Sequence, residues 1–162
     1  MRYLMCSIVR LMATLLLLVS SFSVQADSVK SNAVETLSEP IREILQQEMN
    51  LIQSAVMAII PAYAAGDTDE IISIARSIQD SYILNQRLSQ QQHHELHEKL
   101  PPGFILLDKS VHYYAGMIAE AADQRKYEQI GFYLSRLTES CSQCHRQYAT
   151  HRFPKLEALP GI

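Results

Sequence analysis

Past residue 30, apolar residues recur at spacings of three and four positions instead of alternating strictly with polar ones. This spacing is typical of amphipathic helices, whereas alternation is typical of strands. Glycine and proline cluster at a few breaks, which divide the pattern into four main helical stretches. The pattern predicts an all-α fold, because four amphipathic helices with short connections favour an antiparallel four-helix bundle.

The first helix is predicted to begin near Glu39, with Ser38 as its N-cap and Pro40 in its first turn. We expect Pro61 to kink or shorten its end, and Gly66 to close it. Its inward face carries apolar residues three or four positions apart: Ile41, Leu45, Met49, Ile52, Val56, Ile59 and Tyr63.

The second helix is predicted to open at Asp67, where Glu70 three positions later suggests a capping box. The segment "SQQQHHELHEKLPPGF" then predicts a short polar helix and a turn at its Pro-Pro-Gly. The apolar face of the second helix comprises Ile71, Ile74, Ile78 and Tyr82.

The third helix is predicted over about Phe104 to Ala122, and the fourth over about Tyr127 to His151, before Pro154. The inward residues of the third are Leu107, Val111, Tyr114, Ile118 and Ala121. Those of the fourth are Ile130, Leu134, Leu137, Cys141, Cys144 and Tyr148. Two cysteines therefore fall on the buried stripe of the last helix.

The N-terminal segment 1–26 has the pattern of a secretory signal peptide. Arg2 and Arg10 supply positive charge, Leu11 to Val19 is apolar, and Val24-Gln25-Ala26 resembles a cleavage site. The apolar run is shorter than the roughly 20 residues that a membrane-spanning helix needs. An uncleaved anchor is the alternative. The sequence thus predicts export to the periplasm, no stable membrane insertion after cleavage, and one domain over 27–162.

Cleavage would leave 12 basic and 17 acidic residues, a formal charge of −5, and would remove Cys6. A mildly acidic chain without a basic patch argues against nucleic acid as a partner. The two remaining cysteines both lie in "CSQCH", residues 141–145. One close pair in an exported chain is not a disulfide scaffold.

Cys-x-x-Cys-His is the attachment motif of a c-type haem. On a helix, positions i, i+3 and i+4 share a face, so Cys141, Cys144 and His145 point the same way. The two sulfurs could form thioether bonds with one haem, and the imidazole could bind its iron. The sequence predicts one haem c, attached through both cysteines.

Three other interpretations of the motif compete with haem. A redox Cys-x-x-Cys belongs at the start of a helix, after a strand, where the thiol pKa is lowered. A structural zinc site usually needs a second ligand pair, which the sequence lacks. A bundle in which Cys141 and Cys144 form a disulfide is the third.

With "CSQCHRQY" in the last of four helices, the chain resembles the class II c-type cytochromes, namely cytochrome c prime and its low-spin c-556 relatives. The resemblance covers about residues 38–153. It implies that His145 is the proximal ligand and that the other haem face looks onto the first helix. Many members are homodimers. The family often has a basic residue after the motif tyrosine, whereas Ala149 follows Tyr148 here.

Met49 is the best candidate for the sixth iron ligand, because it lies on the inward face of the first helix, near the helix middle. A thioether opposite imidazole would favour the reduced iron and raise the potential. A gap-filling core methionine is the alternative. Met57 and Met117 are placed less favourably. His112 could be a second histidine ligand, or a boundary histidine bonded to a polar neighbour.

Arg42 lies about two turns before Met49 and could pair with a haem propionate, or could simply be solvated. His93 and His97 share a helix face, but "HHELH" lacks the spacing of a zinc-protease motif. An exposed polar helix is the simpler interpretation of this segment.

These residues predict a periplasmic electron carrier rather than an enzyme, with other periplasmic redox proteins as partners. Its haem iron would have His145 and Met49 as axial ligands. The alternative is a five-coordinate haem protein that binds nitric oxide or carbon monoxide on the same proximal side.

Overall fold

The computed structural model describes residues 33–80 and 88–156, and these residues are helical without a strand. The α-helices are α2 (Glu39–Ala65), α3 (Thr68–Gln79), α5 (Gln90–Lys99), α6 (Pro102–Asp123) and α7 (Tyr127–Tyr148). Two short 3-10 helices, η1 (Ala33–Thr36) and η2 (Pro154–Leu156), flank them. The predicted signal peptide and Tyr82 lie outside the described residues. Across 33–80 and 88–156, no helix has the length and apolar character needed to cross a membrane.

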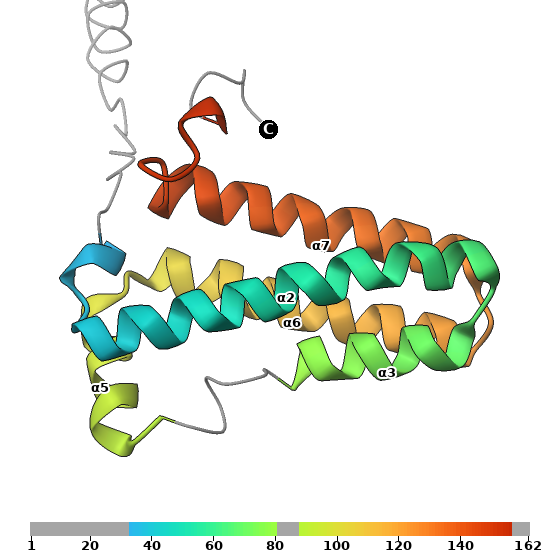
Figure 1. Cartoon of the computed structure of the whole chain (residues 1–162), viewed down its shortest axis with the longest axis horizontal. Coiled ribbons are helices and arrows are strands. Elements are labelled where there is room, and N and C mark those ends of the chain that lie inside the picture. The colour runs from blue at the N-terminus through green and yellow to red at the C-terminus, as the bar shows by residue number, and fades with distance from the viewer. Residues whose placement is uncertain (1–32, 81–87, 157–162) are drawn as a thin grey trace, which may run out of the picture.

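Helices α2, α3, α6 and α7 lie lengthwise in a bundle, and α5 and η1 sit at one end of it (Figure 1). Helix α6 packs most extensively, with α7 on one side and α3 on the other. The α2–α3 and α6–α7 turns lie together at the opposite end (Figure 1). The predicted all-helical fold is confirmed for the described residues.

Helix α2 begins at Glu39 as predicted, but it runs through Pro61 and ends at Ala65. The expectation that Pro61 shortens the helix is therefore wrong. A proline removes the hydrogen bond to the carbonyl four residues earlier, here that of Met57. Met57 is 63% exposed, so water can satisfy that carbonyl. Gly66 closes the helix with a φ of 76°, and the Asp67 N–H donates to the Ala62 carbonyl.

Side-chain caps start helices α3 and α5. The Asp67 side chain accepts a hydrogen bond from the Glu70 N–H at 3.1 Å and starts α3. Ser89 and Gln92 form a reciprocal capping box that starts α5. Helix α7 ends at Tyr148, three residues before the predicted end, because Ala149 leaves the helical region with a φ of −136°.

The core divides into two clusters of buried residues. The larger cluster fills the centre and the turn end of the bundle, and includes Ile59, Ile118 and Leu137, each fully buried. The smaller cluster lies at the other end, and includes Leu45, Phe104 and Tyr148. The predicted inward faces are confirmed for their described residues, but nine of these residues are only partly buried: Met49, Val56, Tyr63, Ile74, Leu107, Tyr114, Leu134, Cys141 and Cys144.

Candidate haem-binding site

Helix α7 carries Cys141, Cys144 and His145 on one side of its last two turns, and both thiols are free and partly buried. Cys141 packs against the larger core cluster, and Cys144 packs against the smaller one. The cysteine pair therefore spans the boundary between the two parts of the core. The Phe104 and Tyr148 rings meet edge to face, with centroids 5.4 Å apart, in the same cluster as Cys144.

Both thiols are held in the neutral form. Burial raises the pKa of Cys141. Burial, with the negative charge of Asp108 as a smaller cause, raises the pKa of Cys144 to about 12. A redox Cys-x-x-Cys needs the opposite, since its attacking cysteine must ionise near neutral pH. The environment of these thiols disfavours that alternative.

His145 is also neutral at pH 7, because burial lowers the pKa of its imidazole. Its ring stacks on that of Phe153, with centroids 4.1 Å apart and an angle of 3° between the planes. A neutral imidazole has the free electron pair that iron ligation requires. The segment after α7 therefore holds the predicted proximal ligand from one side.

Helices α2 and α7 diverge towards the end that carries the motif (Figure 1). Met49 lies on α2 in this part of the bundle, is partly buried, and packs against both core clusters. The structure thus places the predicted distal residue at the same core boundary as the two cysteines. Met57, by contrast, is exposed on α2.

Sequence reasoning missed a buried carboxylate beside Met49. Glu48 has no exposed surface, although acidic side chains are rarely buried completely. Its position could have been found from spacing, because Leu45, Glu48 and Ile52 continue a helical stripe of threes and fours. The carboxylate lies close enough to His112 for its charge to raise the pKa of that imidazole.

The structure gives His112 and Arg42 partners within the protein. Nδ1 of His112 lies 2.6 Å from the Ile78 carbonyl oxygen, so His112 is a boundary histidine with a polar neighbour. Arg42 Nη1 donates to the carbonyl oxygens of Glu35 and Leu37 at 3.1 and 3.2 Å. This arginine fastens η1 to α2, a role that the sequence pattern did not predict.

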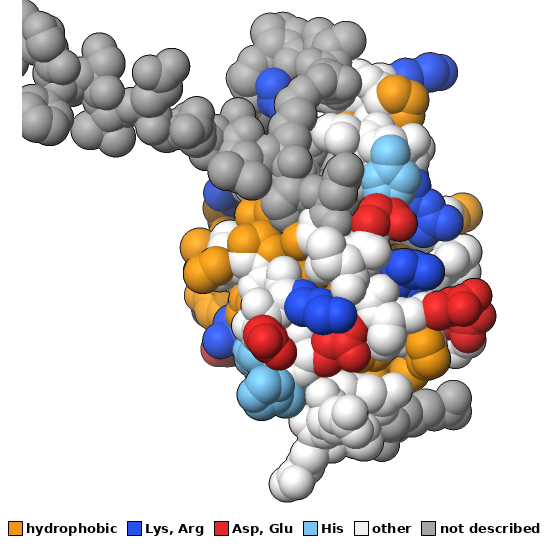
Figure 2. Space-filling view, turned by 90° about the vertical axis from the view of Figure 1, so that its left-hand side faces the viewer, with side chains coloured by type: hydrophobic (Ala, Val, Ile, Leu, Met, Phe, Trp, Pro, Cys, Tyr) orange, Lys and Arg blue, Asp and Glu red, His pale blue; other side chains and the backbone are white. Residues whose placement is uncertain are grey.

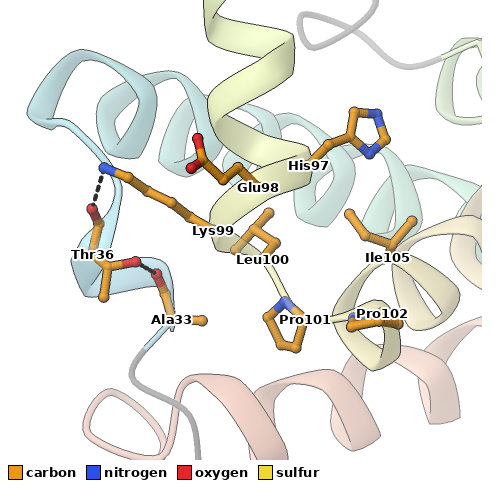
Figure 3. Close-up of a pocket in the computed structure, with 9 residues that line it drawn as sticks. All are labelled: Ala33, Thr36, His97, Glu98, Lys99, Leu100, Pro101, Pro102 and Ile105. Atoms are coloured by element: carbon orange, nitrogen blue, oxygen red, sulfur yellow. Dashed lines mark hydrogen bonds between the residues drawn. The ribbon is translucent and has the colours of Figure 1, made fainter.

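The end of the bundle around η1 and α5 displays acidic, basic and histidine side chains together with apolar patches (Figure 2). Two further contacts bind η1 to its neighbours: His151 Nε2 lies 3.1 Å from Glu35 Oε1, and Lys99 Nζ donates to the Thr36 carbonyl at 2.8 Å. An open hollow lies beside the second contact, lined by Leu100, Pro101 and other residues of the α5–α6 junction (Figure 3). This hollow does not include the cysteine motif.

Within 33–80 and 88–156, no three His, Cys, Asp or Glu side chains converge on a metal-binding point. His93 and His97 lie on α5, where His94 is 79% exposed and pairs with Glu98 at 3.6 Å.

Covalent haem fits the residues present. The helix aligns two unbonded neutral thiols and one neutral imidazole, and these donors lie where the core divides and where α2 and α7 diverge. Cys141 and Cys144 would hold the group, and His145 would bind its iron. Comparison of the chain with protein-family models, curated proteins and solved structures found no match.

Proposed function

We propose that this chain is an exported monohaem c-type cytochrome of class II that carries single electrons in the periplasm. The observation that supports this most is the placement of "CSQCH" on α7, with neutral thiols that pack against the two core clusters and a neutral imidazole directly after Cys144. We also assign the fold to the antiparallel four-helix class, because short turns join α2 to α3 and α6 to α7 at one end of the bundle (Figure 1). The signal peptide over 1–26 would direct export.

Each residue of the proposed site has a distinct task. Cys141 and Cys144 would form the two thioether bonds, for which their protonated thiols are protected from ionisation and disulfide exchange. His145 would bind the iron on the proximal side, with its ring plane held by Phe153. Met49 would supply the sixth ligand from α2. When bound, haem supplies the ferric–ferrous couple.

The proposed axial pair favours electron transfer over small-molecule binding. Methionine opposite histidine stabilises ferrous iron and fills the sixth position. Donors and acceptors would be other periplasmic redox proteins, which exchange electrons without a substrate being transformed. Arg42 stays the candidate partner of a haem propionate, because its two hydrogen bonds to backbone carbonyls both use Nη1.

Absorption spectra test this function. The protein, expressed with the haem-attachment machinery, is expected to be coloured and low-spin when oxidised and reduced, and unchanged by carbon monoxide. Met49→Ala is expected to become high-spin and to bind carbon monoxide, whereas Met57→Ala, which alters an exposed methionine of the same helix, leaves the spectrum unchanged. A wild-type protein that is already high-spin and binds carbon monoxide would contradict the electron-carrier assignment and support gas binding.

A further inference from the structure

Each ring nitrogen of His112 has an oxygen atom beside it, one at hydrogen-bond distance and one at ion-pair distance, although His112 is not a proposed ligand of the haem iron. Its Nδ1 lies 2.6 Å from the Ile78 carbonyl oxygen, and its Nε2 lies 3.7 Å from Asp108 Oδ1. A neutral imidazole carries one N–H, whereas the imidazolium carries two. Only the imidazolium can direct an N–H at both acceptors at once.

The groups that face His112 from each neighbouring helix also favour the protonated ring. Asp108 lies one turn earlier on α6, and α2 contributes the buried carboxylate of Glu48. Helix α3 contributes the Ile78 carbonyl at its C-terminal end, where helix dipoles place partial negative charge. Asp108 also acts on α7, where its charge, after burial, raises the pKa of the Cys144 thiol.

The pKa of His112 reflects two opposing influences, burial and the oxygen atoms around the ring. Burial is the largest single influence and acts to lower the pKa. The Asp108 side chain, the Ile78 carbonyl and the charge of Glu48 together outweigh burial and raise the pKa above 6.5. The side chain is 18% exposed, so a proton can still pass between Nε2 and solvent.

We propose that His112 is a proton-binding site coupled to the haem, so that the protein takes up a proton together with the electron. This inference rests on the proposed function. When an external one-electron donor reduces ferric to ferrous haem iron, Nε2 of His112 takes one proton from solvent. Oxidation by an external acceptor releases the electron, and the same nitrogen returns the proton. Nδ1 keeps its proton throughout, because it donates to Ile78.

The coupling is electrostatic. Reduction would lower the charge of the haem by one, and a partly buried imidazole that shares Asp108 with the motif would sense that change because the interior screens charge weakly. Asp108 connects the two regions, since its carboxylate acts on both His112 and Cys144. The pKa of His112 is therefore higher in the ferrous than in the ferric protein.

The midpoint potential of the holoprotein, measured from pH 5 to pH 10, tests this proposal. Above pH 6.5 the equilibrium constant for reduction is expected to fall by up to tenfold per pH unit, about 59 mV for one electron. His112→Gln, which keeps an N–H donor but cannot titrate, is expected to remove this dependence. His94→Gln, at an exposed histidine beside a carboxylate, is the matched control and should preserve it.

Asp108→Asn gives a second, independent readout if His112→Gln folds poorly. Loss of the carboxylate lowers the pKa of His112, so the pH-dependent part of the curve is expected to move to lower pH. Three results would each overturn the proposal. The first is a wild-type midpoint potential that is constant above pH 6.5. The others are a His112→Gln variant with the same pH dependence of the potential as wild type, and an Asp108→Asn variant whose pH dependence is not shifted to lower pH. A colourless protein overturns the proposed function as well, whereas a coloured protein with a pH-independent potential overturns the proton coupling alone.

Discussion

The two ends of the bundle are built from different kinds of residue. At the turn end, the Tyr63 and Tyr127 rings stack with centroids 5.3 Å apart, and Tyr63 Oη donates to the Tyr127 carbonyl at 3.2 Å. Glycines 66 and 131 leave room for these two tyrosines. At the motif end, the interior holds two thiols, a neutral imidazole and the fully buried carboxylate of Glu48.

We expect this difference to separate residues that stabilise the fold from residues of the proposed haem site. Apolar and aromatic side chains supply the packing at the turn end, and their burial stabilises the fold. Burial of ionisable groups costs free energy unless they are paired or used. The proposed function assigns the cysteines and the imidazole of the motif end to haem binding, and the variants below test that contrast.

The largest effect is expected from Cys141→Ser combined with Cys144→Ser. Without either sulfur no thioether bond can form, so covalent haem content should fall to background while the turn end keeps its helical structure. Haem staining of denaturing gels measures the attachment, and circular dichroism measures the helices. Ser142→Ala, between the two cysteines, is the control. Haem that remains bound through denaturation in the double variant would contradict the assignment.

A substitution that creates a cavity at the turn end should lower the free energy of unfolding without changing the haem spectrum. Ile59→Ala removes a fully buried side chain, which typically costs about 2–5 kcal/mol of unfolding free energy. Urea denaturation should give a similar loss in the holoprotein and in the double cysteine variant. A shifted haem spectrum in Ile59→Ala would mean that the two ends are not separate.

Two glycine substitutions compare the ends directly. Gly66→Ala places a side chain at a φ of 76°, which costs about 1–2 kcal/mol. Thermal unfolding should detect that loss without a change in the haem spectrum. In Gly103→Ala, the new Cβ would collide with Tyr148 Oη in the cluster that Cys144 packs against, so the haem spectrum should change. If Gly66→Ala and Gly103→Ala had the same haem spectrum, the expected contrast between the two ends would be wrong.

The smallest effect is expected from the charge on His112. Its pKa is raised in the folded state, so its stabilising contribution is complete below pH 6.5 and is lost as pH rises through the raised pKa. A protonated histidine at a helix C-terminus typically contributes about 0.3–1 kcal/mol. The stability difference between wild type and His112→Gln should therefore shrink as pH rises from 6 to 9. A difference that grows with pH would contradict the charged assignment.

Helix positions could be predicted from the sequence because spacing and capping are local. The stripe on α2, the Asp67 cap and the Ser38 start all depend on residues within a few positions of one another. Pro61 failed as a helix terminator because the carbonyl it leaves unpaired belongs to an exposed turn. That exposure depends on how α2 packs, which spacing does not reveal.

The environment of the candidate site was less predictable. The alignment of Cys141, Cys144 and His145 followed from helical geometry alone. Glu48 was overlooked because a search for apolar residues excludes a carboxylate, even at a buried position. The contact between His112 and Ile78 joins helices 34 positions apart in sequence, and Arg42 found its partners in η1, a segment that no pattern indicated.

The mass of the denatured mature protein tests the central claim most directly. The chain is produced with its export signal in a host that attaches haem, then purified, denatured and weighed. The account predicts the mass of the mature polypeptide plus one haem, without the mass loss of a disulfide. A mass equal to the polypeptide alone, under conditions where a known c-type cytochrome acquires its haem, would contradict it.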